Sequence, residues 1–396
     1  MSDQSALRAP GSALDVEFPP LDQVRADLRV KWYRCPIDPA TLRRLMSRSD
    51  LQGAFQTLGH LGLFGLTGAL TAIFFVQSMW VPFALALWCH GMVGTFFRGL
   101  AVHELGHGTV FRTKWPNGLF LRVLSLLSWW SYHEYAMSHT YHHRYTLYPD
   151  GDREVVLPAA LPRRVRDVAQ FLTINFSGMY QVVTQTLRMA VPRYNLSLTG
   201  IRTSEWTKAL FELAPEVERK AVRFARLTLL FHGGVLAIAV VFGLWWLPIV
   251  LTGYLFVGNW LALLVGRPMH AGLMDNVPDF RMCVRSNKLN PFFSFLYWRM
   301  NWHTEHHMFA GVPCYNLKKL AAEIADDMPR LRTLRESWVE MIEIEKRQRD
   351  DPGYQLQTPL PATAHPAVLE EGQVELPAGD RLAAEASIGD LAPAGR

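Results

Sequence analysis

Two long windows without any charged residue constrain the fold of this chain more than any other feature. No Lys, Arg, Asp or Glu occurs in residues 51–97 or 227–266, although 19% of the 396 residues are charged. A helix that crosses a bilayer needs about 20 apolar residues, so each window is long enough for two such helices. Pro82 and Pro248, both close to Trp, mark a turn inside each window. The sequence therefore predicts an all-α, polytopic membrane protein with two transmembrane hairpins. The four predicted helices cover roughly residues 58–77, 81–100, 227–246 and 249–266.

The charge distribution predicts the orientation of these hairpins. Two hairpins return the chain to its starting side, so both termini and residues 98–226 share one face of the membrane. All 40 Lys and Arg residues lie in these parts and none in the two short outer turns. Because positive residues are retained in the cytoplasm, we expect both termini and a helical cap between the hairpins to be cytoplasmic.

The rest of the chain predicts one membrane-embedded domain, residues 22–349, between two polar ends. Residues 22–48 place seven basic residues among apolar ones, which is typical of a segment on the membrane surface. Residues 1–21 are polar, and residues 350–396 are acidic and rich in Pro and Ala without periodicity. Both ends are predicted to be disordered.

Histidines recur in three clusters at helical spacing. Residues three or four apart on a helix lie on one face, so each cluster can direct two or three imidazoles at one point. Imidazole is a ligand for zinc, copper, iron and nickel, and the predicted topology places all three clusters on the same side of the membrane. They predict a site for more than one metal ion. The clusters are His103 and His107; His139, His142 and His143; and His303, His306 and His307.

A ninth histidine is predicted to join them. His270 follows the fourth predicted span by four residues, at the depth of His103 after the second span. Nine imidazoles suffice for two metal ions with four or five ligands each. His133 is expected to be packed beside the site rather than bound to metal, and histidines inside the spans are expected to be hydrogen-bonded structurally. The acidic residues near the clusters either orient imidazoles or are solvated: Glu104, Asp152, Asp275 and Glu305.

The first cluster alone also matches the His-Glu-x-x-His motif of zinc proteases, with Glu104 as general base. An intramembrane zinc protease is therefore an alternative. It is a distant one, because such a protease would not use the histidines of the other two clusters. A non-catalytic metal-binding membrane protein is another. The four cysteines are scattered and predict neither a disulfide framework nor an iron–sulfur cluster, and no nucleotide-binding or nucleic-acid-binding pattern occurs.

The order HxxxH, HxxHH, HxxHH, with the first cluster after the second span and the third after the fourth, resembles the membrane fatty acid desaturase family. The resemblance covers roughly residues 55–325, and residues 307–317 are similar to the HHxFPxxPxxxL that closes the family's third box. It implies an oxidoreductase in which the eight box histidines and His270 bind two iron ions. It also implies dioxygen as co-substrate, a double bond inserted into a fatty acyl chain, and two electrons from an external ferredoxin or cytochrome b5-type donor with its reductase.

Departures from the family pattern leave several points open. The third box opens with His303 rather than the Gln of front-end desaturases, and no fused cytochrome b5 motif occurs. Gly266 stands where acyl-CoA desaturases carry Asn. A lipid-linked, carrier-linked or free substrate therefore fits the sequence as well as a CoA ester does. The same boxes occur in hydroxylases, epoxidases and ketolases, which insert oxygen instead. The basic stretch 163–166 is expected to lie against lipid headgroups or to bind an acidic donor.

Overall fold

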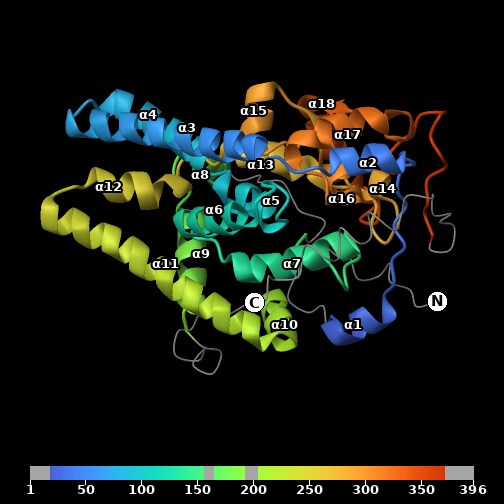
Figure 1. Ribbon diagram of the computed structural model, residues 1–396, viewed down its shortest axis with the longest axis horizontal. Coiled ribbons are helices and arrows are strands. Elements are labelled where there is room, and N and C mark those ends of the chain that lie inside the picture. Colours follow the sequence, from blue (N-terminus) through green and yellow to red (C-terminus); the bar gives the residue numbers. More distant parts are fainter. Residues whose placement is uncertain (1–17, 156–164, 192–203, 371–396) are drawn as a thin grey trace.

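The computed structural model describes residues 18–155, 165–191 and 204–370. These residues are mostly helical, and the strands among them are the parallel two-residue pair β1 (Asn287–Lys288) and β2 (Arg332–Thr333). A cap of short helices makes up one side of the molecule, and two arms of long helices extend from it (Figure 1). The prediction of an all-α fold is confirmed to the extent that the described residues are mostly helical.

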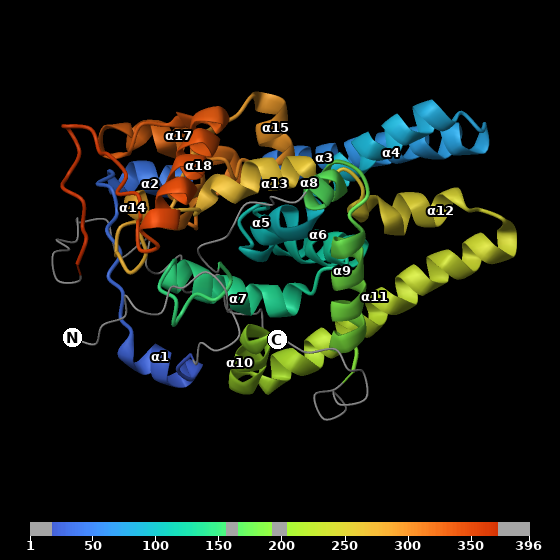
Figure 2. The same ribbon diagram turned by 180° about the vertical axis from the view of Figure 1, so that it is seen from behind.

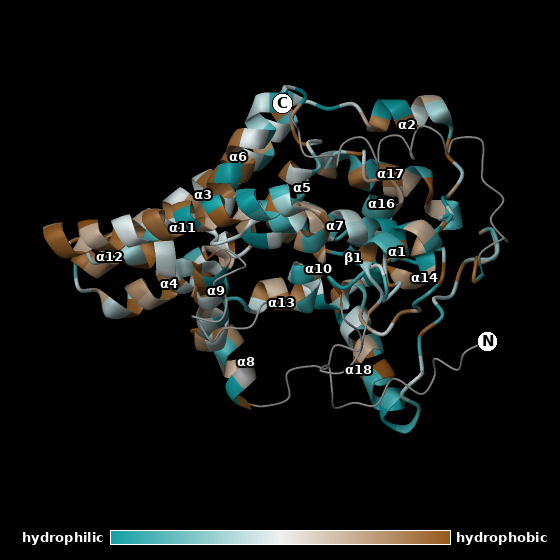
Figure 3. Ribbon diagram, turned by 90° about the horizontal axis from the view of Figure 1, so that it is seen from below, coloured by the Kyte–Doolittle hydropathy of each residue, from teal (hydrophilic) through white to brown (hydrophobic). Residues whose placement is uncertain are grey.

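The arms contain the helices that are suited to a membrane. One arm pairs α3 (Asp50–Val76) with α4 (Trp80–Gly94), and the other contains α11 (Pro215–Phe242). In the described residues, three helical stretches are long and apolar enough to cross a bilayer: Asp50–Val76, Trp80–Gly106 and Pro215–Phe242. Large apolar side chains near the arm tips are exposed, and the hydrophobic residues of the arms are visible in Figure 3. Such surfaces are stable in lipid rather than in water.

The first chain reversal lies where the sequence predicts it, and the second lies a few residues before Pro248, because α11 ends at Phe242 and Trp246–Pro248 is helical. The first helix ends at Val76, and Ser78 adopts a left-handed φ of 56° at the reversal. The second turn follows Gly243, whose φ of 68° ends α11 in the left-handed conformation that glycine accommodates best. Helix α3 begins at Asp50, earlier than predicted, because the Ser49 side chain accepts a hydrogen bond from Gln52 N and caps it.

The prediction of one continuous helix over residues 249–266 is wrong. The segment consists of α12 (Trp246–Pro248), the π-helical turn η4 (Ile249–Gly253) and the 3-10 turn η5 (Tyr254–Phe256), followed by α13 (Trp260–Gly266). Between them Val257 is extended and Gly258 has a φ of 65°. The neighbouring chain satisfies the interrupted backbone, since Gly258 N donates to Thr173 O and Asn175 N donates to Phe256 O. The sequence pattern did not reveal this pairing with a distant segment.

The cap is assembled from the chain on both sides of the second arm. Helix α9 lies beside α11 at the junction of arms and cap (Figure 2). The N-terminal helices are α1 (Leu21–Asp27) and α2 (Pro39–Leu45). Those between the arms are η2 (Phe97–Ala101), α5 (Val102–Gly106), α6 (Lys114–Leu127), α7 (Tyr132–Tyr145), α8 (Val165–Leu172), α9 (Phe176–Met189) and α10 (Glu205–Leu213). Those after the second arm are η6 (Arg267–Met269), α14 (Phe280–Cys283), α15 (Pro291–Leu296), α16 (His303–Met308), η7 (Cys314–Asn316), α17 (Leu317–Glu323), η8 (Ala325–Asp327) and α18 (Leu334–Asp350).

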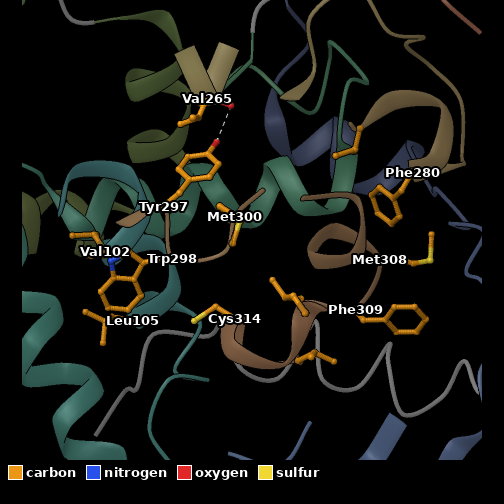
Figure 4. Packing of buried hydrophobic residues seen from close by; sticks show 14 of the residues in the cluster. Val102, Leu105, Val265, Phe280, Tyr297, Trp298, Met300, Met308, Phe309 and Cys314 are labelled. Atoms are coloured by element: carbon orange, nitrogen blue, oxygen red, sulfur yellow. Dashed lines mark hydrogen bonds between the residues drawn. The ribbon is translucent and has the colours of Figure 1, made fainter. Parts of the chain in front are cut away.

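A buried core fixes the third histidine cluster against the first arm. Trp298 is fully buried, and its indole N–H donates to His60 Nδ1 of α3 at 3.0 Å. Close by, the Tyr297 hydroxyl donates to Val265 O of α13 at 3.3 Å, and Figure 4 shows both rings among Val102, Leu105 and Met300. The chain immediately before α16 is therefore held by both α3 and α13.

The chain end differs from the prediction of disorder from residue 350 onward. Residues 351–370 pack against the cap: buried Arg281 donates to the carbonyls of His365 and Pro366, and Val368 N donates to Asp279. His365, which carried no predicted role, binds Asp327 through its backbone N–H at 2.7 Å. The prediction overlooked these contacts because they are mostly made by backbone groups, which composition does not report. Residues 1–17, 371–396 and the first two residues of the basic stretch 163–166 lie outside the described residues.

Candidate metal centre

Three short helical segments bring the histidine clusters together. The first cluster consists of His103 on α5 and His107, the C-cap residue that follows α5. A kink precedes α5, where Arg98 and Gly99 leave helical geometry. The second cluster occupies the last half of α7, and the third occupies α16. The kink redirects the second membrane helix, so that the first cluster faces the other two.

The structure brings all nine predicted histidines into two adjoining groups. Within each group the candidate ligand nitrogens lie within 4.8 Å of one another, and every side chain is buried. On α7, His139 and His143 lie four residues apart on one face, whereas His142 faces the other group. The first group is His103, His107, His139, His143 and His306, and the second is His142, His270, His303 and His307.

The facing nitrogens fit a cation between them. His303 Nε2 lies 3.0 Å from His270 Nε2 and 3.1 Å from His307 Nε2. The Nδ1 of His270 lies 3.1 Å from the carbonyl oxygen of Cys283, which can only accept, so this nitrogen carries the proton. A neutral His270 then directs the Nε2 lone pair at His303. Neutral His303 can donate one Nε2–H to only one of its two neighbours, so at least one lone pair is left without a donor, and a bound metal ion would accept it.

Two carboxylates hold imidazoles of the second cluster. Asp152 Oδ2 lies 2.9 Å from His142 Nδ1 and also accepts from Leu147 N, and Glu154 Oε1 lies 3.2 Å from His139 Nδ1. A carboxylate on Nδ1 fixes the ring and leaves the Nε2 lone pair directed into the site. Asp152 was among the predicted candidates for this role. Glu154 was not, although its spacing two residues after Asp152 was visible in the sequence.

Other imidazoles are oriented by partners from neighbouring elements. The Thr146 hydroxyl donates to His142 O at 2.6 Å, so its oxygen accepts from His307 Nδ1 at 3.1 Å. Glu104 Oε1 lies 2.8 Å from His103 Nδ1 and 3.7 Å from His306 Nδ1, between the first and third clusters. The site is therefore positioned by groups from three parts of the chain.

Burial keeps most of these imidazoles neutral, as metal ligands must be. It lowers the pKa of His107 and of His270 to about 3. His142 is different: burial opposes its charged form, but the carboxylates of Asp152 and Glu154 together outweigh burial and raise its pKa. Burial also raises the pKa of Glu154 to about 7. In five other ligands the pKa is held well below its usual range, mainly by burial and to a smaller extent by neighbouring imidazoles. These are His139, His143, His303, His306 and His307.

A cavity of about 250 Å³ adjoins both histidine groups. Its wall combines apolar side chains with a few polar ones, and Gly99 and Gly266 line it without filling it. A Cβ added at Gly266 would meet only the Tyr297 hydroxyl, at 3.8 Å. The cavity is lined by His103, His139, His142, His270 and His303, together with Leu100, Tyr135, Glu154, Val155, Arg267, Met269, Ala271 and Met300.

The other singled-out residues lie elsewhere. The ring of His133 packs against Tyr132 and Phe224, outside both groups. The histidines inside the membrane helices are hydrogen-bonded to backbone carbonyls as predicted, His60 to Val93 O and His90 to Val250 O. His232 likewise contacts Leu126 O. Glu305 accepts from the Ser286 hydroxyl, and Asp275 N donates to the Gln355 side chain.

The comparisons with known proteins agree with this geometry. The sequence matches the family model for fatty acid desaturase over residues 30–338, which is well over half of the chain and includes all nine histidines. No curated protein sequence matches the chain. The chain belongs to the fatty acid desaturase family, membrane-bound oxidoreductases with a diiron centre that act on lipids.

Proposed function

We propose that the protein is an oxygen-dependent lipid desaturase that inserts a double bond into a fatty acyl chain. The observation that carries the proposal is the pair of buried all-histidine groups beside one cavity with an apolar wall. Dioxygen is the co-substrate, and an external ferredoxin or cytochrome b5-type donor with its reductase supplies two electrons.

The nine histidines would hold two iron ions, five around one and four around the other. A single ion takes fewer ligands than nine, and zinc in proteins is almost always bound by four. A diiron centre supplies the oxidising power for removing hydrogen from an unactivated C–H bond.

The protein's own residues exclude water and fix the geometry. All nine imidazoles are buried, so the reacting centre is shielded from solvent. Asp152, Glu154 and Thr146 hold the Nδ1 atoms of three ligands, which keeps their Nε2 lone pairs directed inward. Leu100, Val155 and Met300 provide apolar contacts for one segment of an acyl chain, and Gly99 and Gly266 leave it space.

Oxygen insertion is the alternative outcome of the same chemistry, and hydroxylase, epoxidase or ketolase activity shares every residue named above. The zinc protease alternative receives less support. Glu104, which would act as general base, has no exposed surface, and its Oε1 lies 2.8 Å from His103 Nδ1 rather than in the cavity wall.

For the membrane arrangement we propose four crossings, the fourth made by the broken segment 246–266. The cap, both termini and the metal centre then lie on the cytoplasmic side, because Lys and Arg are lacking in both outer turns. A reporter fused after Arg396 tests this arrangement. Activity of the reporter only outside the cytoplasm would contradict it.

The reaction itself is tested by mass spectrometry of total lipids. The protein is expressed with a ferredoxin and its reductase, beside an otherwise identical strain that carries His306→Ala. A desaturase produces acyl chains that have lost two hydrogens, whereas an oxygen-inserting enzyme produces chains that have gained oxygen. Lipids identical to those of the His306→Ala strain would refute both.

A further inference from the structure

We propose that electrons enter this protein through Trp32, and that the basic surface around Trp32 is the docking site of an acidic one-electron carrier protein. This inference rests on the proposed function, because it assumes that the two histidine groups hold redox-active metal ions.

Two successive ring contacts, one stacked and one tilted by 47°, lead from Trp32 through Phe280 to His307 of the second histidine group. The Trp32 and Phe280 rings are stacked at 4.0 Å with an interplanar angle of 9°, and Phe280 lies 5.5 Å from the His307 ring. Trp32 retains 9% of its surface exposed, whereas Phe280 retains 2%. Electron tunnelling weakens steeply with distance and is favoured by contacts without gaps. These ring contacts are therefore a short path from the protein surface to a candidate ligand.

The same tryptophan also reaches the first histidine group. Its indole N–H donates to the carbonyl oxygen of Arg144 at 2.9 Å, and Arg144 directly follows His143 in the chain. The His143 and His307 rings lie 4.5 Å apart and nearly parallel. Trp32 is thus connected to both histidine groups: through the Phe280 ring to the second group, and through the hydrogen bond to Arg144 O to the first. A side chain that only filled space would need neither connection.

The position of this tryptophan suits a soluble partner. It lies on the segment between α1 and α2, which the sequence predicts on the membrane surface but which runs along the end of the cap opposite the membrane arms (Figure 1). A protein that docks at this end is not obstructed by the bilayer.

The charges around Trp32 favour an acidic partner. Residues 28–37 contain three basic residues and no acidic one. Arg29 and Lys31 are exposed, and so is Arg144, whose carbonyl accepts the indole hydrogen bond. Exposed Asp27 and Asp38 flank this window, and the longer stretch of residues 22–48 still holds seven basic residues against three acidic ones. Complementary charge of this kind accelerates association and makes it dependent on salt.

The electron count closes with two encounters. Each reduced carrier loses one electron and leaves oxidised, and the metal pair gains one electron each time. No bond forms or breaks at the rings, and no proton is transferred there.

Docking is tested by binding, which is independent of turnover. Oxidised plant-type [2Fe–2S] ferredoxin and a soluble cytochrome b5 domain are titrated into the purified full chain at low and at high salt. We expect Arg29→Glu with Lys31→Glu to slow association on the order of tenfold at low salt and to flatten the salt dependence. The matched control is Arg219→Glu with Lys220→Glu, two exposed residues on α11. Equal effects of the two pairs, or no salt-dependent binding of either carrier to the unchanged protein, would overturn the docking site.

The path is tested by the anaerobic rate at which reduced ferredoxin is oxidised by the iron-loaded protein. Trp32→Leu should slow this rate severalfold with a full iron complement, and Trp32→Phe, which keeps a ring on Phe280, should restore most of it. Dithionite with a small mediator bypasses the docking site and should reduce all three proteins alike. A Trp32→Leu protein that is reduced by ferredoxin at the unchanged rate, or that is equally slow with dithionite, would refute the path. Failure of dithionite-reduced unchanged protein to alter lipids would instead count against the proposed function.

Discussion

At the residue scale, the centre is a set of buried imidazoles whose nitrogens are not all hydrogen-bonded: His139 Nε2 is buried and has no hydrogen-bond partner among the described residues. His303 Nε2 has two imidazole nitrogens within 3.1 Å, and at least one of them directs a lone pair at it. Buried polar atoms without a partner are costly, so the free energy of metal binding is also free energy of folding here.

His270 is the ligand that the histidine boxes do not include. Replacing it by Ala should lower iron affinity by more than about tenfold and reduce turnover as severely as His306→Ala, since each change removes one imidazole from a group. Iron content and lipid products are measured for both variants, with His133→Ala as the control from outside the groups. If His270→Ala keeps its iron and its turnover, the ligand set shrinks to eight.

Gly266 is expected to set the room available to the substrate. Gly266→Leu should fill part of the cavity. The new Cβ should cause little strain, because the Tyr297 hydroxyl, 3.8 Å away, is the only atom of the described residues within 4 Å of it outside the adjacent chain. Turnover of a long acyl substrate should fall strongly while iron content stays unchanged. Gly62→Leu on the exposed side of α3 is the control, because nothing lies within 4 Å of its added Cβ. Equal turnover in the two variants would show that the acyl chain does not pass Gly266.

At the element scale, the break between η5 and α13 positions α13, the helix that leads through η6 to His270. Gly258 has a φ of 65°, and a Cβ there would lie 2.8 Å from Trp88 O. Gly258→Ala should therefore lower the free energy of unfolding by about 1–2 kcal/mol from the left-handed backbone alone, and by more from the clash. The shift in Tm is compared with that of Gly253→Ala, where the nearest atom is 3.6 Å away. Comparable Tm values would mean that the break tolerates a side chain.

The elements also show what a sequence can and cannot predict. The positions of the chain reversals follow approximately from the charge-free windows and from Pro82 and Pro248, because these are local signals. The convergence of the histidine segments was predicted from helical spacing and shared sidedness. The break at Gly258 and the contact of Glu154 with His139 depend on distant segments folding back, and no local pattern encodes them. That the nine histidines bind iron stays a prediction until metal is measured.

At the scale of the whole molecule, residues 351–370 close the cap. Arg281 is fully buried, is paired with Asp279 and Asp327, and donates to two carbonyls of residues 365–366. Ending the chain after Asp350 removes these acceptors and uncovers the pair. Unfolding free energy should fall by about 1–3 kcal/mol for each charged hydrogen bond that is lost. The chain that ends after Glu370 should match the full chain in Tm, and an equally stable chain ending after Asp350 would show that the segment contributes nothing.

The central claim is that this fold holds two iron ions in two all-histidine groups. The most direct measurement is the number of metal ions per chain in protein purified after iron-replete expression, by elemental analysis. Two irons per chain are predicted, since five and four buried imidazoles converge on adjoining points. One tightly bound zinc without a second ion would contradict the account.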